Sequence, residues 1–180
     1  MEMKQVDLAN AYRLLGHGPT VLVSTQGQFP NASAVAWTMP VSKDPPRFAM
    51  RIGEGHKTYA DIMERKCCVI NIPTQDHVDK VMVCGTKSGN EGDKLTPAGI
   101  VTTPAKLVDA PRLDFCAAWL ECELVGNLEL DGTCLVLVEA KLVECLVQAM
   151  GKDDRWNIVQ YPTLHHLGGS SFSVPGKIIK

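Results

Sequence analysis

The sequence of 180 residues predicts an all-β protein with a few inserted helices, arranged as one antiparallel barrel. The chain holds seven or more extended runs that are separated by turn residues. The dipeptide Asp131-Gly132 lies between two long runs and is a strong hairpin signal. Helical periodicity occurs in few places and does not alternate regularly with the strands, which argues against a doubly wound parallel sheet. The length suits a single domain over residues 1–180.

The first quarter of the chain predicts a short helix followed by three strands. Asp7–Leu15 has an amphipathic pattern and is followed by glycines. Thr20–Thr25 and Ala32–Met39 are β-rich runs on either side of the turn at Gln26–Asn31, so we expect them to form a hairpin. Arg47–Ile52 follows three prolines and predicts a third strand.

The middle of the chain changes period. His56–Lys66 places apolar residues at i, i+3 and i+4, which predicts a helix, and the β-branched run Cys67–Ile72 predicts a strand. Thr74 is a plausible N-cap for a helix from Gln75 to about Val83. The following segment, Cys84–Thr96, is rich in Gly, Ser, Asn and Asp and predicts a loop. Long loops in compact domains are usually functional or disordered.

The second half of the chain predicts more strands. Ile100–Thr103 and Ala105–Val108 are short extended pieces. Ala117–Val125 and Thr133–Val147 are longer strands joined by the hairpin signal. Tyr161–Lys180 is rich in glycine and serine around a histidine pair.

Composition and charge exclude several classes of protein. Hydrophobic residues make up 45% and charged residues 21% of the chain, as in globular proteins, so a disordered or low-complexity chain is excluded. The net charge is −2 and no Lys/Arg run exceeds two residues, which argues against nucleic-acid binding. No apolar run approaches the roughly 18 residues of a membrane span. The first residues carry acids rather than a basic signal-peptide region, so we expect a cytoplasmic protein with no membrane partner.

The pattern of the seven cysteines indicates buried structural residues and not disulfide bonds or metal ligands. Their number is odd and none are spaced as C-x-x-C, so neither a disulfide framework nor a zinc site is expected. We expect most of them to be small buried hydrophobic residues. Cys84, which precedes Gly85, lies in a loop-like context where a thiol could meet a ligand.

Two segments near the predicted strand ends could bind a ligand. Ala36–Ser42 combines backbone groups at a strand end with soft apolar walls that suit a flat heteroaromatic ring, or it is an ordinary core tryptophan and a turn. Arg51 and His56–Thr58 place basic groups and a hydroxyl at a helix start, where orphan N–H donors favour an anion. The commoner interpretation is a helix start with solvated basic residues.

Two later segments carry further polar groups. In Cys84–Leu95 the glycines allow close approach of backbone to a ligand, and Lys87 and Lys94 could reach a phosphate; the alternative is a flexible surface loop. In Leu164–Phe172 the adjacent histidines would point to opposite sides of an extended chain, so no metal site is expected. The sequence lacks a G-x-G-x-x-G, a P-loop and a G-x-S-x-G elbow.

The order of these segments resembles the flavin reductase-like family, and within it the flavoredoxins in particular. The resemblance spans roughly residues 21–177. The matching stretches are Ala36-Trp37-Thr38-Met39-Pro40, Pro45-Pro46, residues 59–66, Asn71-Ile72-Pro73, Gly85-x-x-Ser88-Gly89, Asp93-Lys94-Leu95, Leu107-Val108-Asp109-Ala110-Pro111, Leu120-Glu121-Cys122, His166-Leu167-Gly168 and Phe172-Ser173. The chain departs from the family in having His56-Lys57 where flavoredoxins tend to carry an arginine, and Thr133-Cys134-Leu135 where many relatives have a histidine.

The resemblance implies an antiparallel split β-barrel that binds FMN and is usually a homodimer. It implies that Trp37–Pro40 lies along the isoalloxazine and that His56–Thr58 hold the 5′-phosphate, with Ser88 and Lys94 nearby. Cys84–Gly89 would contact the ribityl chain or the pyrimidine edge. The cofactor-binding residues that we expect are Trp37, Thr38, Met39, Pro40, Ser42, Arg51, His56, Lys57, Thr58, Cys84, Gly85, Ser88, Gly89, Lys94 and His166.

The implied activity is that of an NAD(P)H:flavin oxidoreductase, in which hydride passes from nicotinamide to N5 of FMN. Such chemistry needs stacking and alignment above all, and no acid–base pair stands out. His166 is the one candidate for a catalytic contact, from the C-terminal segment and across a dimer if one forms. A flavoredoxin-type electron carrier that takes electrons from a redox protein without binding nicotinamide remains open, as does a barrel that only stores flavin.

Overall fold

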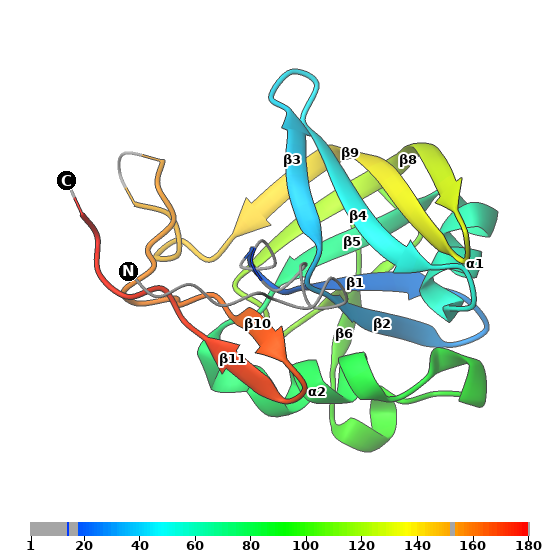
Figure 1. The fold of residues 1–180 in the computed structure, drawn as a ribbon, viewed down its shortest axis with the longest axis horizontal. Coiled ribbons are helices and arrows are strands. Elements are labelled where there is room, and N and C mark those ends of the chain that lie inside the picture. The colour runs from blue at the N-terminus through cyan, green and yellow to red at the C-terminus, as the bar shows by residue number, and fades with distance from the viewer. Residues whose placement is uncertain (1–13, 15–17, 152–153, 180) are drawn as a thin grey trace, which may run out of the picture.

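The computed structural model describes residues 14, 18–151 and 154–179. Within these residues the main sheet has seven antiparallel strands in the order β2-β1-β5-β8-β9-β4-β3, as Figure 1 shows. Its strands are β1 (Val21–Gln26), β2 (Pro30–Val35), β3 (Thr38–Ser42), β4 (Arg47–Gly53), β5 (Cys67–Ile72), β8 (Ala118–Leu130) and β9 (Thr133–Cys145). The predicted mostly β, antiparallel fold with inserted helices is confirmed.

The remaining elements lie beside this sheet. Two small hairpins pair β6 with β7 and β10 with β11. The bounds are α1 (Lys57–Arg65), η2 (Gln75–His77), α2 (Val78–Thr86), η3 (Gly89–Glu91), η4 (Thr96–Ala98), β6 (Thr102–Pro104), β7 (Pro111–Leu113), β10 (His165–Gly168) and β11 (Ser171–Ser173).

The sheet curls because its two edge strands are neighbours in the chain. β2 ends at Val35 and β3 begins at Thr38, so only Ala36 and Trp37 separate the two edges. The carbonyl of Trp37 accepts a hydrogen bond of 3.0 Å from the N–H of Arg51, which holds this link against β4. The sheet therefore closes through a chain connection at this point, while its hydrogen-bond ladder stays open.

Both faces of the central strands are buried, in two separate cores. In β1, Val21 and Val23 pack into the core enclosed by the curled sheet, together with Met50 and Val136. Leu22 faces the other way. It joins a second core with α2 and the loops, of which the other members include Val81, Cys84, Leu95, Leu113 and Leu164. This burial on both sides explains why Val21, Leu22 and Val23 are all apolar instead of alternating with polar residues.

The first helix and the long hairpin agree with their sequence patterns. α1 buries Ile62 fully, and Tyr59 and Met63 pack against the sheet core, as the helical spacing predicts. The tight turn between β8 and β9 has positive φ at both Asp131 and Gly132, as a two-residue hairpin turn requires. All seven cysteines are free and all but Cys145 are buried, which confirms their expected place.

Several boundaries differ from the prediction. The run 32–39 is two strands, not one, because the chain turns at Ala36-Trp37 from one edge of the sheet to the other. Thr74 stands at the N-cap position of η2, but its side chain makes no capping hydrogen bond. α2 continues to Thr86, so the predicted loop starts after that residue.

The later boundaries differ too. β8 extends five residues beyond its predicted end, to Leu130, because it pairs with β9 along its whole length. The second extended piece predicted at 105–108 is irregular, and β7 forms instead at Pro111–Leu113. The glycine-rich C-terminal segment forms the β10–β11 hairpin. The predicted helix at 7–15 lies outside the described residues apart from Leu14, and no described helix is long and apolar enough to cross a membrane.

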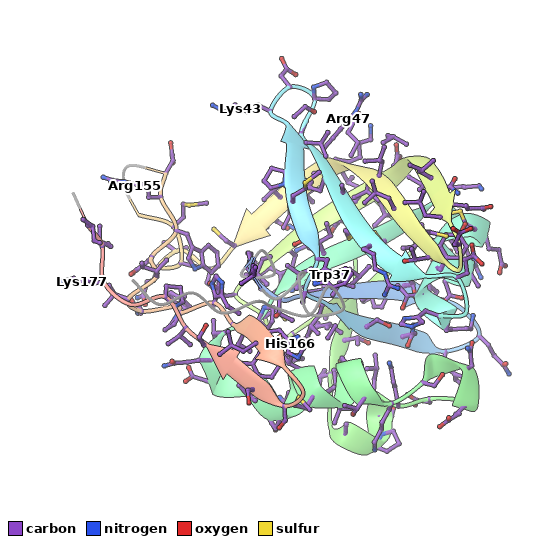
Figure 2. All side chains as sticks on the ribbon, in the orientation of Figure 1. Trp37, Lys43, Arg47, Arg155, His166 and Lys177 are labelled. Atoms are coloured by element: carbon purple, nitrogen blue, oxygen red, sulfur yellow. The ribbon has the colours of Figure 1, made fainter. Side chains whose placement is uncertain are left out.

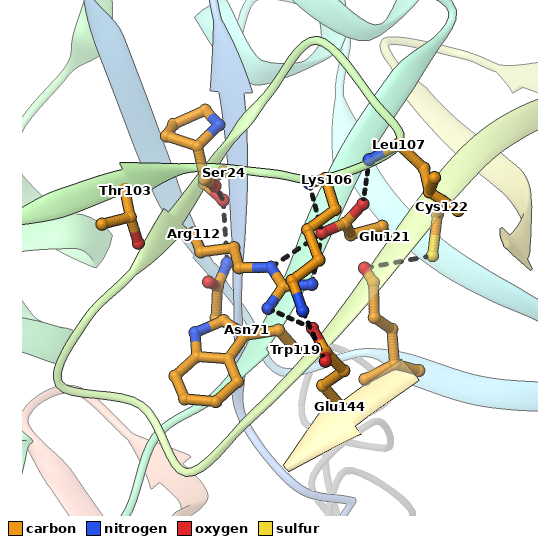
Figure 3. A network of polar contacts seen from close by, with 12 residues as sticks. Ser24, Asn71, Thr103, Lys106, Leu107, Arg112, Trp119, Glu121, Cys122 and Glu144 are labelled. Carbon is orange, nitrogen blue, oxygen red and sulfur yellow. Dashed lines mark hydrogen bonds and ion pairs between the residues drawn. The ribbon is translucent and has the colours of Figure 1, made fainter. Parts of the chain in front are cut away.

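A buried ion network fastens the segment between β6 and β7 to the sheet. Glu121 on β8 is fully buried, and its carboxylate accepts hydrogen bonds from the backbone N–H groups of Lys106 (2.8 Å) and Leu107 (2.7 Å), as Figure 3 shows. The Arg112 guanidinium contacts Glu121 and also pairs with Glu144 at 2.7 Å. The network thus ties two of the stretches that carry the family resemblance, 107–111 and 120–122, to each other.

Candidate functional site

A groove made of two adjoining cavities lies between β2, α2 and the C-terminal hairpin. The polar cavity has a volume of about 190 Å³ and the apolar cavity about 220 Å³. Both are lined by Ala34 of β2 and by Gly85 and Thr86 of α2, so the two spaces share a wall. Figure 1 shows α2 and the β10–β11 hairpin on the same side of the sheet.

The polar cavity opens at the start of α1. His56 is the N-cap residue with an extended backbone, and both His56 and Lys57 line the cavity. The first N–H groups of a helix have no acceptor within the helix, and the first turn of α1 holds no acidic residue that would compete for them. Lys87 and Lys94 line the same cavity. This end of the groove therefore suits an anion.

The Lys57 ammonium is already paired. It contacts the carboxylate of Asp61, one turn further along α1. The Asp61 side chain is fully buried and also accepts a hydrogen bond of 2.8 Å from the Thr25 hydroxyl. The charge of Lys57 is thus largely compensated within the protein, although its side chain still forms part of the cavity wall.

Thr58 is buried and lies behind the cavity. Its hydroxyl accepts a hydrogen bond of 3.0 Å from the Asn31 amide and lies 2.6 Å from the hydroxyl of Ser33. The side chain of Thr58 therefore joins α1 to β2, and Ser33 is the member of this trio that lines the cavity.

Lys94 and Cys84 lie at the C-terminal end of α2. The Lys94 ammonium is buried and donates to the carbonyls of Cys84 (3.1 Å) and Lys87 (2.7 Å), which closes the C-terminal end of the helix. Burial lowers the pKa of Lys94 and raises the pKa of the Cys84 thiol to about 11. The expected loop position of Cys84 is wrong: the residue is helical and packed in the second core, and its thiol stays protonated.

The glycines of this region allow close packing of protein on protein. A Cβ on Gly89 would lie 2.4 Å from Oδ1 of Asn31, and a Cβ on Gly85 would lie 3.2 Å from Cβ of Ala34. Ser88 caps the short helix η3, because its hydroxyl accepts a hydrogen bond of 3.2 Å from the N–H of Asn90. All three sequence-predicted residues line the polar cavity.

The apolar cavity receives His166 from the C-terminal hairpin. The His166 ring lies 5.3 Å from the ring of Phe172, centroid to centroid, and its Nε2 lies 3.0 Å from the carbonyl oxygen of Gly169. Ala36 and Met82 form other parts of the wall. This end of the groove suits a flat, mostly apolar group.

The strand predicted to lie along a ring does not line either cavity. Thr38, Met39, Pro40 and Ser42 belong to the edge strand β3, and Trp37 precedes it; Figure 2 shows Trp37 at the base of β3. The Arg51 guanidinium stacks over Trp37 at 5.5 Å from the ring centre. From this stretch of sequence it is Ala36 that reaches the groove.

Sequence reasoning missed several residues of the wall. Ser33 and Ala34 fall inside the run 32–39, which reads as an ordinary strand, and Thr20 is only the first residue of the earlier run Thr20–Thr25. Gly55, Val81 and Met82 were missed as well. Ala36 and Thr86 lie inside the segments 36–42 and 84–89 that the sequence singled out, although neither was named as a binding residue. The one available signal was the small size of residues 32–36, since small side chains leave room for a ligand against a sheet.

Comparison with known proteins places the chain in a family. Residues 12–169 match the family described as "Flavin reductase like domain". The chain is 33% identical over 184 residues to the uncharacterized protein YddH of Escherichia coli (strain K12), and this match covers 96% of this chain and 94% of YddH.

Two solved structures share the fold. A flavoredoxin of Desulfovibrio vulgaris (Miyazaki F) matches with a TM-score of 0.87 at 24% identity, over 100% of this chain and 96% of that one. The FMN-binding domain of a flavin reductases-like enzyme from Shewanella baltica OS155 matches with a TM-score of 0.82 at 29% identity, over 97% and 95% of the two chains. The fold is therefore the split-barrel type that the sequence predicts, and the chain belongs to the flavin reductase-like family.

Proposed function

We propose that this chain binds FMN in the groove and acts as an NAD(P)H:flavin oxidoreductase. The observation that carries the proposal is the polarity of the groove, which has helix N–H donors and basic residues at one end and an apolar, aromatic wall at the other. FMN has the same two halves, a phosphate ester and a flat ring system. The similar domain from Shewanella baltica is itself an FMN-binding one, which supports the same cofactor here.

The residues present fit this cofactor. The N–H groups that begin α1, with His56 and Ser88 beside them, would hold the phosphate. Ala34 and Gly85, which line both cavities, carry no large side chain, so an extended ribityl chain could run over them from one cavity to the other. Ala36, Met82 and His166 would bound the ring.

Bound FMN would supply the redox chemistry, and the protein would supply binding and orientation. The apolar cavity offers a mostly apolar wall at one end of the groove, and the Nε2 contact with Gly169 fixes the ring of His166 in place. A carbonyl oxygen only accepts hydrogen bonds, so this contact assigns the proton to Nε2 of His166.

An electron carrier that is reduced by another protein is the second candidate. It is favoured by the start of β9, where Thr133 is followed by the fully buried Cys134, so this segment offers no histidine to a nicotinamide. Trp37 and Met39 lie exposed beside the groove and could contact a redox partner.

Titration of the purified apoprotein with FMN and riboflavin tests the binding proposal. We expect FMN to bind at least tenfold more tightly, because charge-assisted hydrogen bonds to a phosphate contribute roughly 1.5–3 kcal/mol. Equal affinity for the two flavins would contradict the phosphate site. Oxidation of NADH or NADPH with added FMN would support the reductase, whereas reduction only by a reduced ferredoxin-type donor would support the carrier.

A further inference from the structure

Thr20 is a buried polar residue in the wall of the apolar cavity. Its residue surface is 3% exposed, and among the described residues its hydroxyl has no hydrogen-bond partner. The backbone of Thr20 is firmly held, because its N–H donates a 2.7 Å hydrogen bond to the carbonyl of Leu164. Buried hydroxyls are almost always bonded, so an unpartnered one needs an explanation.

The other side chains of the cavity do not supply a partner. Apart from Thr20, the polar side chains of the wall are Thr86 and His166. The Thr86 hydroxyl donates to the carbonyl of Met82 at 2.7 Å within α2, and Nε2 of His166 is engaged by Gly169. Among the described residues that line this cavity, Thr20 therefore carries the buried side-chain oxygen that has no hydrogen-bond partner.

We propose that Thr20 is a specificity-determining residue that hydrogen-bonds the polar edge of the flavin ring; this inference rests on the function proposed above. The pyrimidine edge of an isoalloxazine presents two carbonyl oxygens on either side of an N–H. A hydroxyl can both donate and accept, so it can match either kind of group. A purely apolar ring offers no such partner. Thr20 would thus select a flavin-type heteroaromatic ring over an apolar ring of the same size.

The substitution Thr20→Val tests this inference, because valine keeps the shape and removes the hydroxyl. We expect the dissociation constants of FMN and riboflavin to rise by the same factor, about three- to tenfold, since both flavins share the ring. We expect the variant apoprotein to melt at the same temperature as the wild type or higher, because an unpartnered buried hydroxyl destabilises the free protein. The matched control Thr20→Ser restores the hydroxyl and should restore most of the affinity.

The two readouts separate a binding role from a structural one. A lower melting temperature of the Thr20→Val apoprotein together with weaker binding would assign Thr20 to the fold and overturn the inference. Unchanged affinity for both flavins, or a loss confined to FMN, would overturn it as well. A wild-type chain that binds no flavin would overturn the proposed function and this inference together, whereas a flavin-binding wild type with an indifferent Thr20→Val variant would overturn this inference alone.

Discussion

Gly89 stands where the loop after α2 meets α1 and β2. A Cβ at this position would lie 2.4 Å from Oδ1 of Asn31 and 3.2 Å from Cβ of Lys57, so neither neighbour could stay in place. We expect Gly89→Ala to push the loop outward and to reduce the free energy of unfolding by the few kcal/mol typical of overpacking. The melting temperature should therefore fall, and FMN binding should become weaker. Gly55 lines the same cavity and has open space around its Cβ position, so Gly55→Ala is the matched control. Equal effects of the two substitutions in differential scanning fluorimetry and flavin titration would contradict this prediction.

For single residues, the sequence predicted which side chains line the polar cavity better than it predicted their hydrogen-bond partners. His56, Lys57 and Ser88 line the polar cavity together, as their position near a helix start and in a glycine-rich segment suggested. The partners could not be predicted, because they depend on contacts far apart in the chain. The Lys57 ammonium pairs with the Asp61 carboxylate, which also accepts a hydrogen bond from Thr25. The Thr58 hydroxyl accepts a hydrogen bond from Asn31. Helix spacing alone does not show whether such a side chain faces a ligand or another part of the protein.

At the scale of elements, the segment between β6 and β7 is held to the sheet by the carboxylate of Glu121. Burial alone would raise the pKa of Glu121, but the N–H donors of Lys106 and Leu107 and the Arg112 guanidinium outweigh it and hold the pKa below its ordinary value. A group with a lowered pKa in the folded state stabilises the protein above its unfolded pKa, and this stabilisation is lost as the pH falls through the folded pKa.

The free energy of unfolding should therefore decrease as the pH is lowered from about 4.5. Glu121→Gln should reduce the free energy of unfolding at neutral pH and should also reduce this dependence on acid. We expect a loss of about 1–3 kcal/mol, less than for a fully isolated buried charge, because Arg112 keeps its contact with Glu144. The more exposed Glu144 provides the control, and Glu144→Gln should have a smaller effect. Urea unfolding from pH 3 to 7 measures both, and an unchanged acid dependence in Glu121→Gln would refute the assignment.

Elements with strong local signals were predictable, and those built by long-range pairing were not. Cys67–Ile72 and the turn at Asp131-Gly132 follow from β-branched composition and turn chemistry. The division of 32–39 into β2 and β3 follows instead from the closure of the curled sheet. Likewise β7 forms where the fully buried Asn71 accepts a hydrogen bond of 2.8 Å from the N–H of Leu113, a contact across 42 positions of the chain.

For the whole molecule, the mostly β, antiparallel class could be predicted from the number of extended runs and the turns between them, and the split-barrel type from the order of motifs that resembles the flavin reductase-like family. The groove could not, because its wall is assembled from β2, α2 and the C-terminal hairpin. The hairpin in particular comes from a segment, 165–173, whose glycines and serines carry little strand signal. His166 reaches the cavity from a hairpin that follows the buried Leu164, whose carbonyl accepts a hydrogen bond from the N–H of Thr20, just before β1.

The edge of the sheet predicts a homodimer. β3 is an edge strand whose side chains include the exposed Met39 and Val41, and the chain after β9 exposes Val147 almost completely. Exposed apolar edge strands invite association and are normally covered or charged. A second copy of the chain would cover them, and a stable dimer would bury about 2,000 Å² in total. Light scattering at micromolar concentration should therefore give twice the chain mass, and a monomeric wild type would refute the prediction.

Charged substitutions locate this interface. Met39→Lys combined with Val41→Lys should convert the dimer to a monomer without changing the far-UV circular dichroism, because both side chains are exposed and touch neither core. Leu128 is similarly exposed at the distant end of the β8–β9 hairpin, so Leu128→Lys is the matched control and should stay dimeric. Since Ala36 and Trp37 connect β3 to the groove, loss of the dimer should also weaken flavin binding if a partner copy steadies this link. A dimer that survives the double substitution and dissociates in Leu128→Lys would move the interface to the hairpin.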